Sequence, residues 1–220
     1  MLEKVYYWLH NRFSKPQERG EYSAGCWHVQ VRRRVLELCG EVQGRLLEVG
    51  CGEGLFLEEA LKTVPAKEIF GVDIWQDILQ RAKTRLRRDD KVNVLLSQAD
   101  AASLPFKDNS LDCVVCVNVF LNLPSGKMVK EVLREISRVT KKQGKAIFDI
   151  RNRDNPFLYF KYKFAPLYDA TVKSLPLKTY RFDKIIAYLE EAGLKFNKRL
   201  NVGFPDNRYA PIFVIEAVKQ

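Results

Sequence analysis

Residues 46–54, LLEVGCGEG, combine an apolar run with alternate glycines, a pattern typical of a loop that binds a small molecule. The apolar run predicts a buried parallel strand, and glycine at Gly50, Gly52 and Gly54 permits positive φ angles and lets a ligand approach the backbone. A helix predicted over 55–63 would direct its first N–H groups to the same place, where they favour an anionic group. We therefore expect a ligand here, although a purely structural turn is the alternative.

The glycine spacing distinguishes between two kinds of nucleotide-binding loop. Dinucleotide-binding folds use G-x-G-x-x-G, in which the third glycine lets the helix pack closely on the strand. This chain has G-x-G-x-G, and Leu55 occupies the place of that third glycine. The spacing therefore disfavours a dinucleotide cofactor.

Two carboxylates follow the next apolar runs along the chain. Asp73 lies in a strand predicted over 68–74, about 20 residues beyond the glycine loop, where an acid can accept hydrogen bonds from both hydroxyls of a ribose. Asp100 follows a strand predicted over 92–96, and we expect it to close that strand. In that position its carboxylate could accept a hydrogen bond from the amino group of an adenine.

Two stretches resemble motifs of the class I S-adenosylmethionine (SAM) dependent methyltransferases. Glu48, two residues before the first glycine of G-x-G-x-G, is similar to their motif I. Residues 103–112, SLPFKDNSLD, resemble the LPF-x-D-x-SFD connection into the fourth strand of the methyltransferases related to the ubiquinone and menaquinone biosynthesis enzymes. The resemblance covers residues 45–150, and the motif residues in register are Glu48, Gly50, Gly52, Gly54, Asp73, Asp100 and Asp112.

The resemblance implies SAM as the cofactor and an in-line SN2 transfer of its methyl group to a small-molecule acceptor. It implies that the residues that bind the cofactor are Glu48, Gly50, Gly52, Gly54, Asp73, Ile74, Asp100, Ala101 and Asn118. Because the sulfonium is already activated, alignment and desolvation of the reactants suffice, and no dedicated catalytic residue is required. A satisfied turn asparagine is the alternative interpretation of Asn118.

Candidate acceptor-binding residues lie on both sides of this core. The insert that follows the fifth predicted strand alternates aromatic and basic residues, and in the family such an insert builds a lid over the substrate. His28 would suit a general base if the acceptor were a hydroxyl or an acidic carbon, although an exposed histidine without a chemical role is the alternative. The candidates are Tyr22, Trp27, His28, Arg151, Tyr159 and Tyr162, and ordinary packing is the alternative for the aromatic ones.

Other functional classes are weaker but remain open. An amino-methylating DNA enzyme would carry an Asn/Asp-Pro-Pro-aromatic tetrad after the fourth strand, whereas residues 118–121 read NVFL. An RNA methyltransferase remains an alternative through the basic and aromatic insert, although no separate RNA-binding module is recognisable. A protein that binds SAM without transferring the methyl group is a further alternative. We expect a small acceptor with an anionic or aromatic group.

Length and composition favour one domain. A chain of 220 residues that is 46% hydrophobic suits one well-buried α/β domain. We divide it into N-terminal cap helices (1–40), a SAM-binding core (41–150), a substrate-lid insert (151–181), and a closing helix and hairpin (182–220). The expected fold is a seven-stranded, Rossmann-like methyltransferase α/β fold, with five parallel strands, helices on both faces, and a C-terminal β-hairpin that carries the antiparallel strand.

The periodicity of apolar residues locates the elements of this fold. A turn-forming loop, 203–207, separates the two strands of the hairpin. Helices are predicted over 2–13, 27–38, 55–63, 75–87, 127–140 and 182–192, and strands over 46–49, 68–74, 92–96, 111–120, 146–150, 194–202 and 210–218. In the second helix, the three arginines at 32–34 are expected to face solvent.

The net charge and the cysteines limit which partners and which cellular compartment we expect. The formal charge is +10, and residues 46–150 are nearly neutral, with 16 Lys/Arg against 15 Asp/Glu. The excess outside that core favours an anionic substrate, a membrane surface or a nucleic acid, with a basic solvated surface as the simpler alternative. Cys113 and Cys116 would point to opposite faces of one strand, which disfavours a metal site. No apolar run approaches the length of a membrane span, and we expect a cytoplasmic protein.

Overall fold

The computed structural model describes residues 27–86, 94–168 and 178–220. The helix predicted over 2–13 and the candidate residue Tyr22 lie outside the described residues.

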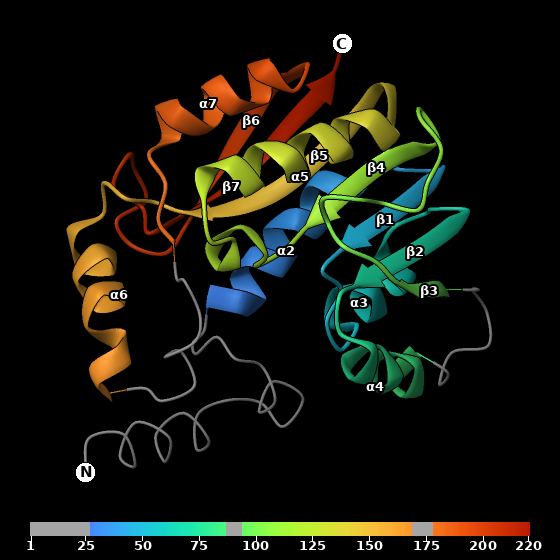
Figure 1. Cartoon of the computed structure of the whole chain (residues 1–220), viewed down its shortest axis with the longest axis horizontal. Coiled ribbons are helices and arrows are strands. Elements are labelled where there is room, and N and C mark those ends of the chain that lie inside the picture. Colours follow the sequence, from blue (N-terminus) through green and yellow to red (C-terminus); the bar gives the residue numbers. More distant parts are fainter. Residues whose placement is uncertain (1–26, 87–93, 169–177) are drawn as a thin grey trace.

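The described residues form one seven-stranded sheet (Figure 1). Its order is β3-β2-β1-β4-β5-β7-β6; the first five strands are parallel, and β7 runs antiparallel to both neighbours. The strands are β1 (Arg45–Val49), β2 (Glu68–Asp73), β3 (Val94–Gln98), β4 (Leu111–Cys116), β5 (Thr140–Arg151), β6 (Leu194–Val202) and β7 (Ile212–Lys219). The expected fold class, including the antiparallel strand in a C-terminal hairpin, is confirmed.

Helices cover both faces of the sheet and enclose two apolar clusters (Figure 1). One cluster lies beneath α5 (Gly126–Val139) and α7 (Phe182–Glu191); the other lies beneath α2 (Trp27–Cys39), α3 (Leu55–Thr63) and α4 (Gln76–Leu86). A short 3-10 helix, η2 (Phe120–Asn122), follows β4. Within the described ranges, none of the helices combines the length and apolar character needed to cross a membrane.

Strand β4 shows why the central strands read as continuous apolar runs. Its side chains alternate between the two clusters: Val114 and Cys116 belong to the α5/α7 side, and Cys113 and Val115 to the α2/α3/α4 side. Both faces are buried over 113–116, so these positions are apolar or small, whereas Asp112 near the start of the strand is half-buried and binds Lys141 and the Arg45 N–H. The expectation that the two cysteines face opposite ways is therefore confirmed.

Two expectations about these elements are wrong. The strand predicted to run to residue 120 ends at Cys116, because Asn118 adopts a left-handed φ of 59° that interrupts the extended backbone. Arg32 was expected to face solvent but is buried, and its Nε lies 3.3 Å from the Glu59 carboxylate of α3. Arg32 lies next to buried Val31, on the side of α2 that contacts α3. Only the other two arginines of the triplet are exposed.

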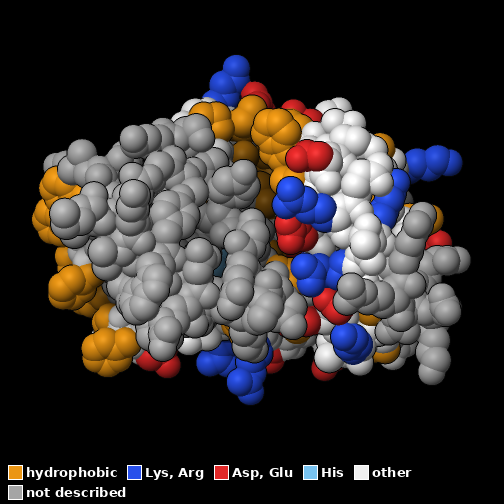
Figure 2. All heavy atoms as spheres, turned by 90° about the horizontal axis from the view of Figure 1, so that it is seen from below, with side chains coloured by type: hydrophobic (Ala, Val, Ile, Leu, Met, Phe, Trp, Pro, Cys, Tyr) orange, Lys and Arg blue, Asp and Glu red, His pale blue; other side chains and the backbone are white. Residues whose placement is uncertain are grey.

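The insert after β5 leaves and rejoins the sheet at one point, which we call the neck. Asn152 and Tyr180 form a parallel bridge, the Tyr180 N–H donates to the Arg151 carbonyl, and the Arg153 N–H donates to the Tyr180 carbonyl. The Tyr180 hydroxyl also donates to the Phe120 carbonyl, 2.9 Å away. The described part of the insert contains α6 (Pro156–Tyr168), which lies beyond the carboxyl edge of the sheet (Figure 1). Hydrophobic side chains project along the left edge of Figure 2, on the side of α6.

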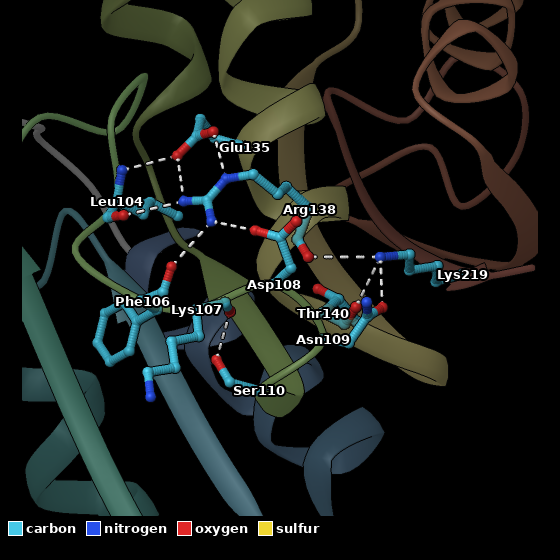
Figure 3. A network of polar contacts seen from close by, with 10 residues as sticks. All are labelled: Leu104, Phe106, Lys107, Asp108, Asn109, Ser110, Glu135, Arg138, Thr140 and Lys219. Atoms are coloured by element: carbon cyan, nitrogen blue, oxygen red, sulfur yellow. Dashed lines mark hydrogen bonds and ion pairs between the residues drawn. The ribbon is translucent and has the colours of Figure 1, made fainter.

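A network centred on Arg138 of α5 holds the connection between β3 and β4 (Figure 3). Its guanidinium donates to the carbonyls of Leu104 and Phe106, at 3.0 and 2.9 Å, and pairs with Asp108 at 2.7 Å. Glu135, one turn earlier, binds the same guanidinium and accepts from the Leu104 N–H. The LPF-x-D stretch is thus a loop whose backbone polar groups are satisfied by one ion pair of α5.

We predict that Arg138→Met lowers the free energy of unfolding by about 2–3 kcal/mol, because it leaves two loop carbonyls and two carboxylates without their charged donor. Urea denaturation measures this. Arg134→Met, an exposed change on the same helix, should alter stability by no more than about 0.5 kcal/mol.

The effect should depend on pH. The hydrogen bond from Arg138 is the largest influence that holds the pKa of Glu135 below its usual value. A carboxylate with a lowered folded pKa stabilises fully above its unfolded pKa, about 4.3, and loses this contribution as the pH falls through the folded value. The difference between the wild type and Arg138→Met should therefore be constant near neutrality and shrink below about pH 4. A difference that does not change with pH would contradict this role for Glu135.

Candidate functional site

The glycine loop between β1 and α3 is built from left-handed residues. Gly50, Gly52 and Gly54 have φ angles of 73°, 51° and 79°. The N–H groups of Gly50 and Cys51 both donate to the Val72 carbonyl, at 2.8 and 2.9 Å, which ties the loop to the end of β2. The loop therefore turns sharply above the carboxyl edge of the sheet, and α3 begins directly after it.

The three glycines differ in what surrounds the missing side chain. A Cβ on Gly50 would overlap Val119, and a Cβ on Gly54 would lie 3.3 Å from both Ala82 and Leu86. A Cβ on Gly52 would meet nothing within 4 Å in the described part of the chain. Two of the glycines are thus explained by close packing, whereas Gly52 borders open space that a ligand could fill.

Asp73 is fixed at the end of β2 by two backbone donors. One carboxylate oxygen accepts from the Gly52 N–H at 2.9 Å, and the other accepts from the Trp75 N–H at 3.0 Å. The side chain is buried, and each oxygen keeps a further lone pair. The expectation that Asp73 ends its strand beside the glycine loop is confirmed, and its geometry suits two hydroxyl donors.

Glu48 and Cys51 complete the buried base of the loop. Glu48 lies inside β1, where it pairs in register with Gly71 of β2 and Val115 of β4. Burial, followed by the charges of Glu48 and Asp73, raises the pKa of the Cys51 thiol well above its usual value. Cys51 therefore stays a neutral thiol and is unsuited to act as a nucleophile.

Ile74, Asp100 and Ala101 form the outer rim of the site. Ile74 is 51% exposed, and its carbonyl accepts from the Gln98 side chain at 2.9 Å, which joins the ends of β2 and β3. Asp100 was expected to close β3, but the strand ends at Gln98, and the Asp100 carboxylate accepts from the Ala102 N–H in a turn. This turn leaves Asp100 exposed, with free acceptor capacity at the rim, and Ala101 half-buried beside it.

A buried polar network lies at the ends of the neighbouring strands β4 and β5. Its centre is an ion pair between Asp149 and Arg151 of β5, both at most 2% exposed. Asp149 also accepts from the Asn118 N–H at 2.6 Å, and Arg151 donates to the Asn118 side-chain oxygen at 2.6 Å. Asn118 lies two residues beyond β4, and these contacts hold its left-handed backbone.

The network determines the tautomer of His28. Because the guanidinium of Arg151 takes the Asn118 oxygen, the Asn118 amide nitrogen must face His28 Nδ1, which lies 2.8 Å away. An amide nitrogen can only donate, so Nδ1 is an acceptor and the neutral ring carries its proton on Nε2. His28 is buried, so its interpretation as an exposed histidine is wrong, and this tautomer makes it a donor at Nε2.

Arg151 links the network to α6. Burial acts to lower the pKa of the guanidinium, but Tyr162 and Asp149 raise it above its usual value, so the group stays charged. Its Nε donates to the Tyr162 hydroxyl of α6 at 3.0 Å. The predicted residues His28, Asn118, Arg151 and Tyr162 are therefore brought together.

The other predicted residues are more peripheral. Trp27, half-buried at the start of α2, has Lys161 of α6 5.0 Å from the centre of its ring. Tyr159 is 39% exposed and packs edge-on against Phe160 of the same helix. Within the described part of the chain, no hydrogen bond is seen from the side chain of Trp27 or Tyr159 to the Arg151 network.

Asp149 is the residue that the sequence-based reasoning missed. It lies within an apolar run, residues 146–150, and two residues before Arg151. Side chains two positions apart in a strand point to the same face. The spacing of Asp149 and Arg151 in a buried strand could therefore have predicted an ion pair.

The sequence is similar to those of known methyltransferases. The model of a methyltransferase domain family matches residues 47–148. The chain is 31% identical over 176 residues to a demethylmenaquinone methyltransferase of Lactobacillus johnsonii, and the alignment covers 71% of each chain. It is 30% identical over 122 residues to a demethylmenaquinone methyltransferase of Lactococcus lactis, which covers 55% of this chain but only 46% of the relative.

A solved structure shares the fold. Magnesium protoporphyrin IX methyltransferase of Synechocystis PCC 6803, determined with bound SAH, has a TM-score of 0.70 and 15% sequence identity, over 99% of this chain and 94% of that one. At this identity the similarity concerns the fold alone.

We predict strong energetic coupling between Asp149 and Arg151. Asp149→Leu or Arg151→Met alone should lower the free energy of unfolding by about 3–5 kcal/mol, because each leaves the other charge buried without its partner. The double variant should be more stable than the sum of the two effects by about 2 kcal/mol or more. Urea denaturation of the four proteins measures the coupling, and simple additivity would show that the pair is not the centre of the network.

Proposed function

The chain belongs to the class I SAM-dependent methyltransferases related to the menaquinone biosynthesis enzymes, and on this premise we propose that it transfers a methyl group from SAM to a small-molecule acceptor. In this proposal the cofactor lies against the Gly50–Gly54 loop, between Asp73 and the rim formed by Ile74 and Asp100. The acceptor lies toward the Arg151 network and α6. The buried cysteines, free among the described residues, suit a reducing compartment, and we propose the cytoplasm.

The open space beside Gly52 is the observation that carries this proposal. It lies next to the Asp73 carboxylate, whose orientation is already fixed by the Gly52 N–H. A ribose in that space would find two acceptor oxygens held in place before binding, so little ordering entropy would be lost. The residues present therefore fit the cofactor that the family uses.

Each predicted cofactor residue has a distinct task in this proposal. Asp73 accepts from the ribose hydroxyls, and Asp100 accepts from the adenine amino group. Ile74, exposed at the rim, covers one face of the adenine ring, with Ala101 beside it. Glu48 and Asn118 line the inner end of the site, where the amino acid part of the cofactor would lie. SAM supplies an activated methyl group on a sulfonium.

The contribution of the chain to the reaction is alignment and exclusion of water. The network of Asp149, Arg151 and Asn118 holds rigid polar groups at the ends of β4 and β5, beside the glycine loop. Rigid groups align an acceptor nucleophile with the methyl group without reorganising. His28, whose Nδ1 accepts from the Asn118 amide, would help to hold that amide in place beside the acceptor.

The relatives favour a small acceptor. The Lactobacillus johnsonii and Lactococcus lactis proteins are, by their names, methyltransferases for demethylmenaquinone. We propose an acceptor with an aromatic group for this chain also, bound beside Tyr162 of α6, whose hydroxyl accepts a hydrogen bond from Arg151. The phenol ring can contact an aromatic ring of the acceptor by its face or its edge.

We predict that Gly52→Ala weakens SAM binding by about tenfold or more, because the added methyl group fills the space that the cofactor needs. Titration calorimetry with SAM, S-adenosylhomocysteine and NAD measures this. Gly193→Ala is the matched control: Gly193 also has a left-handed φ, 74°, and its added Cβ would meet only the Ser137 hydroxyl at 3.9 Å, at the end of α7. It should lose stability as Gly52→Ala does, with SAM affinity unchanged. Binding of NAD in place of SAM would overturn the proposal.

We further predict that the protein transfers radiolabel from SAM to low-mass material in a cell extract. The label should remain after nuclease treatment of the extract and should fall by about tenfold or more with Gly52→Ala at limiting SAM. Label that appears in RNA, and that nuclease removes, would replace the small acceptor with RNA. SAM binding without any transfer would favour a non-catalytic SAM-binding protein.

A further inference from the structure

One face of α6 carries exposed aromatic side chains. Phe157, Phe160 and Phe164 are 82%, 55% and 46% exposed. Spacings of three and four residues place them along one side of the helix. Leu158 and Tyr162, which face the protein, lie on the other side. The helix therefore has one side that packs against the described part of the protein and another that carries exposed aromatic rings.

The loop between β6 and β7 continues this surface. Phe204 is 90% exposed, the largest exposed fraction of any large hydrophobic residue in the described ranges. The loop is held against the start of α6, since the Asn155 side chain donates to the Tyr209 carbonyl at 2.7 Å and accepts from the Leu158 N–H at 2.7 Å. We call Phe157, Phe160, Phe164 and Phe204 the aromatic surface.

Trp27 joins the same two elements on their inner side. A Cβ on Gly203, the residue before Phe204, would lie 3.2 Å from Trp27 Nε1, and the Lys161 ammonium lies 5.0 Å from the Trp27 ring. The aromatic surface thus rests on a packed support. In Figure 2, hydrophobic side chains project along the left edge of the molecule, on the side of α6.

Basic residues outnumber acidic residues in the segments that carry or adjoin the aromatic surface. The exposed cations of these segments, apart from Lys161, are Arg153, Lys178, Arg181, Lys184 and Arg208, and the exposed acids are Asp154, Asp183 and Asp206. Asp154 pairs with Arg181 at 3.7 Å, and the excess of cations over acids remains. Residues 151–220 as a whole carry 13 Lys/Arg and 7 Asp/Glu.

We propose that α6 and the 203–209 loop dock on the surface of an anionic lipid bilayer. Exposed phenylalanines in segments with an excess of lysine and arginine suit a helix that lies in a membrane interface, where rings enter the acyl region and cations meet lipid phosphates. A protein partner would be expected to bury a flatter or hollowed patch of matched shape. A fluid bilayer imposes no such match, so separate protruding rings on a helix and a loop suit it best.

Docking in this orientation leaves the proposed active site intact. Tyr162, which contacts Arg151, lies on the opposite side of α6 from the aromatic surface. The bilayer would therefore lie beside the acceptor end of the site, with α6 between them. The inference rests on the exposed surface and stands whether or not the chain transfers methyl groups.

Flotation with lipid vesicles tests the proposal. The full chain should float with vesicles of equal parts phosphatidylcholine and phosphatidylglycerol, and more weakly with phosphatidylcholine alone, and its binding should fall as salt is raised. The triple variant Phe157→Ser, Phe160→Ser, Phe204→Ser should lose about tenfold or more in partition. Arg153→Gln with Arg208→Gln should remove most of the preference for anionic vesicles.

Leu95→Ser is the matched control. Leu95, on β3 at the other end of the sheet, is 57% exposed, so this variant also loses an exposed apolar side chain but should float as the wild type does. Thermal unfolding of every variant shows that it is folded. No flotation of the wild type, or equal flotation of the triple variant, would overturn the proposal. A concentration-dependent dimer that the triple variant abolishes, with no vesicle binding, would assign the surface to a second copy of the chain.

Discussion

The buried ion pair between Asp149 and Arg151 is the interaction on which the proposed acceptor side of this structure depends. Two charges at most 2% exposed would be costly if either stood alone, so their mutual geometry is tightly constrained. That constraint extends outward to three elements. Asp149 fixes the turn at Asn118 after β4, Arg151 orients the Asn118 amide and so the tautomer of His28 in α2, and Arg151 also holds Tyr162 in α6.

The cofactor side depends on a different kind of constraint. Asp73 uses both carboxylate oxygens to hold backbone N–H groups, so the acid and the glycine loop position one another. The Arg138 network acts at a greater distance, since it fixes the 104–108 connection that follows the rim turn at Asp100 (Figure 3). The site is therefore assembled from loops, but each loop is tied to a strand end or to a helix by charged groups.

Most of the sheet and the glycine loop of the proposed cofactor side could be predicted from the sequence, because each is formed by residues that are adjacent in the chain. A buried strand is a continuous apolar run, and the glycines directly precede α3, so the pattern and the structure it predicts lie in the same stretch. The acceptor side was less predictable. Asn118, Asp149 and His28 are distant in the sequence, and only pairing of β4 with β5 beneath α2 brings them together. Arg32 escaped for the same reason: its partner, Glu59, belongs to another helix.

The neck formed by Asn152 and Tyr180 gives the insert a fixed start and a fixed end on the sheet. Both ends of the insert are held by backbone hydrogen bonds to the end of β5, so this pairing does not require a particular length of chain between them. Closing a loop of twice the length costs only about 0.6 kcal/mol more. The segment between them can therefore be lengthened or shortened at little cost to the strands and the glycine loop. Because we propose that the acceptor lies toward this insert, a change in its length would alter the acceptor end and leave the glycine loop as it is.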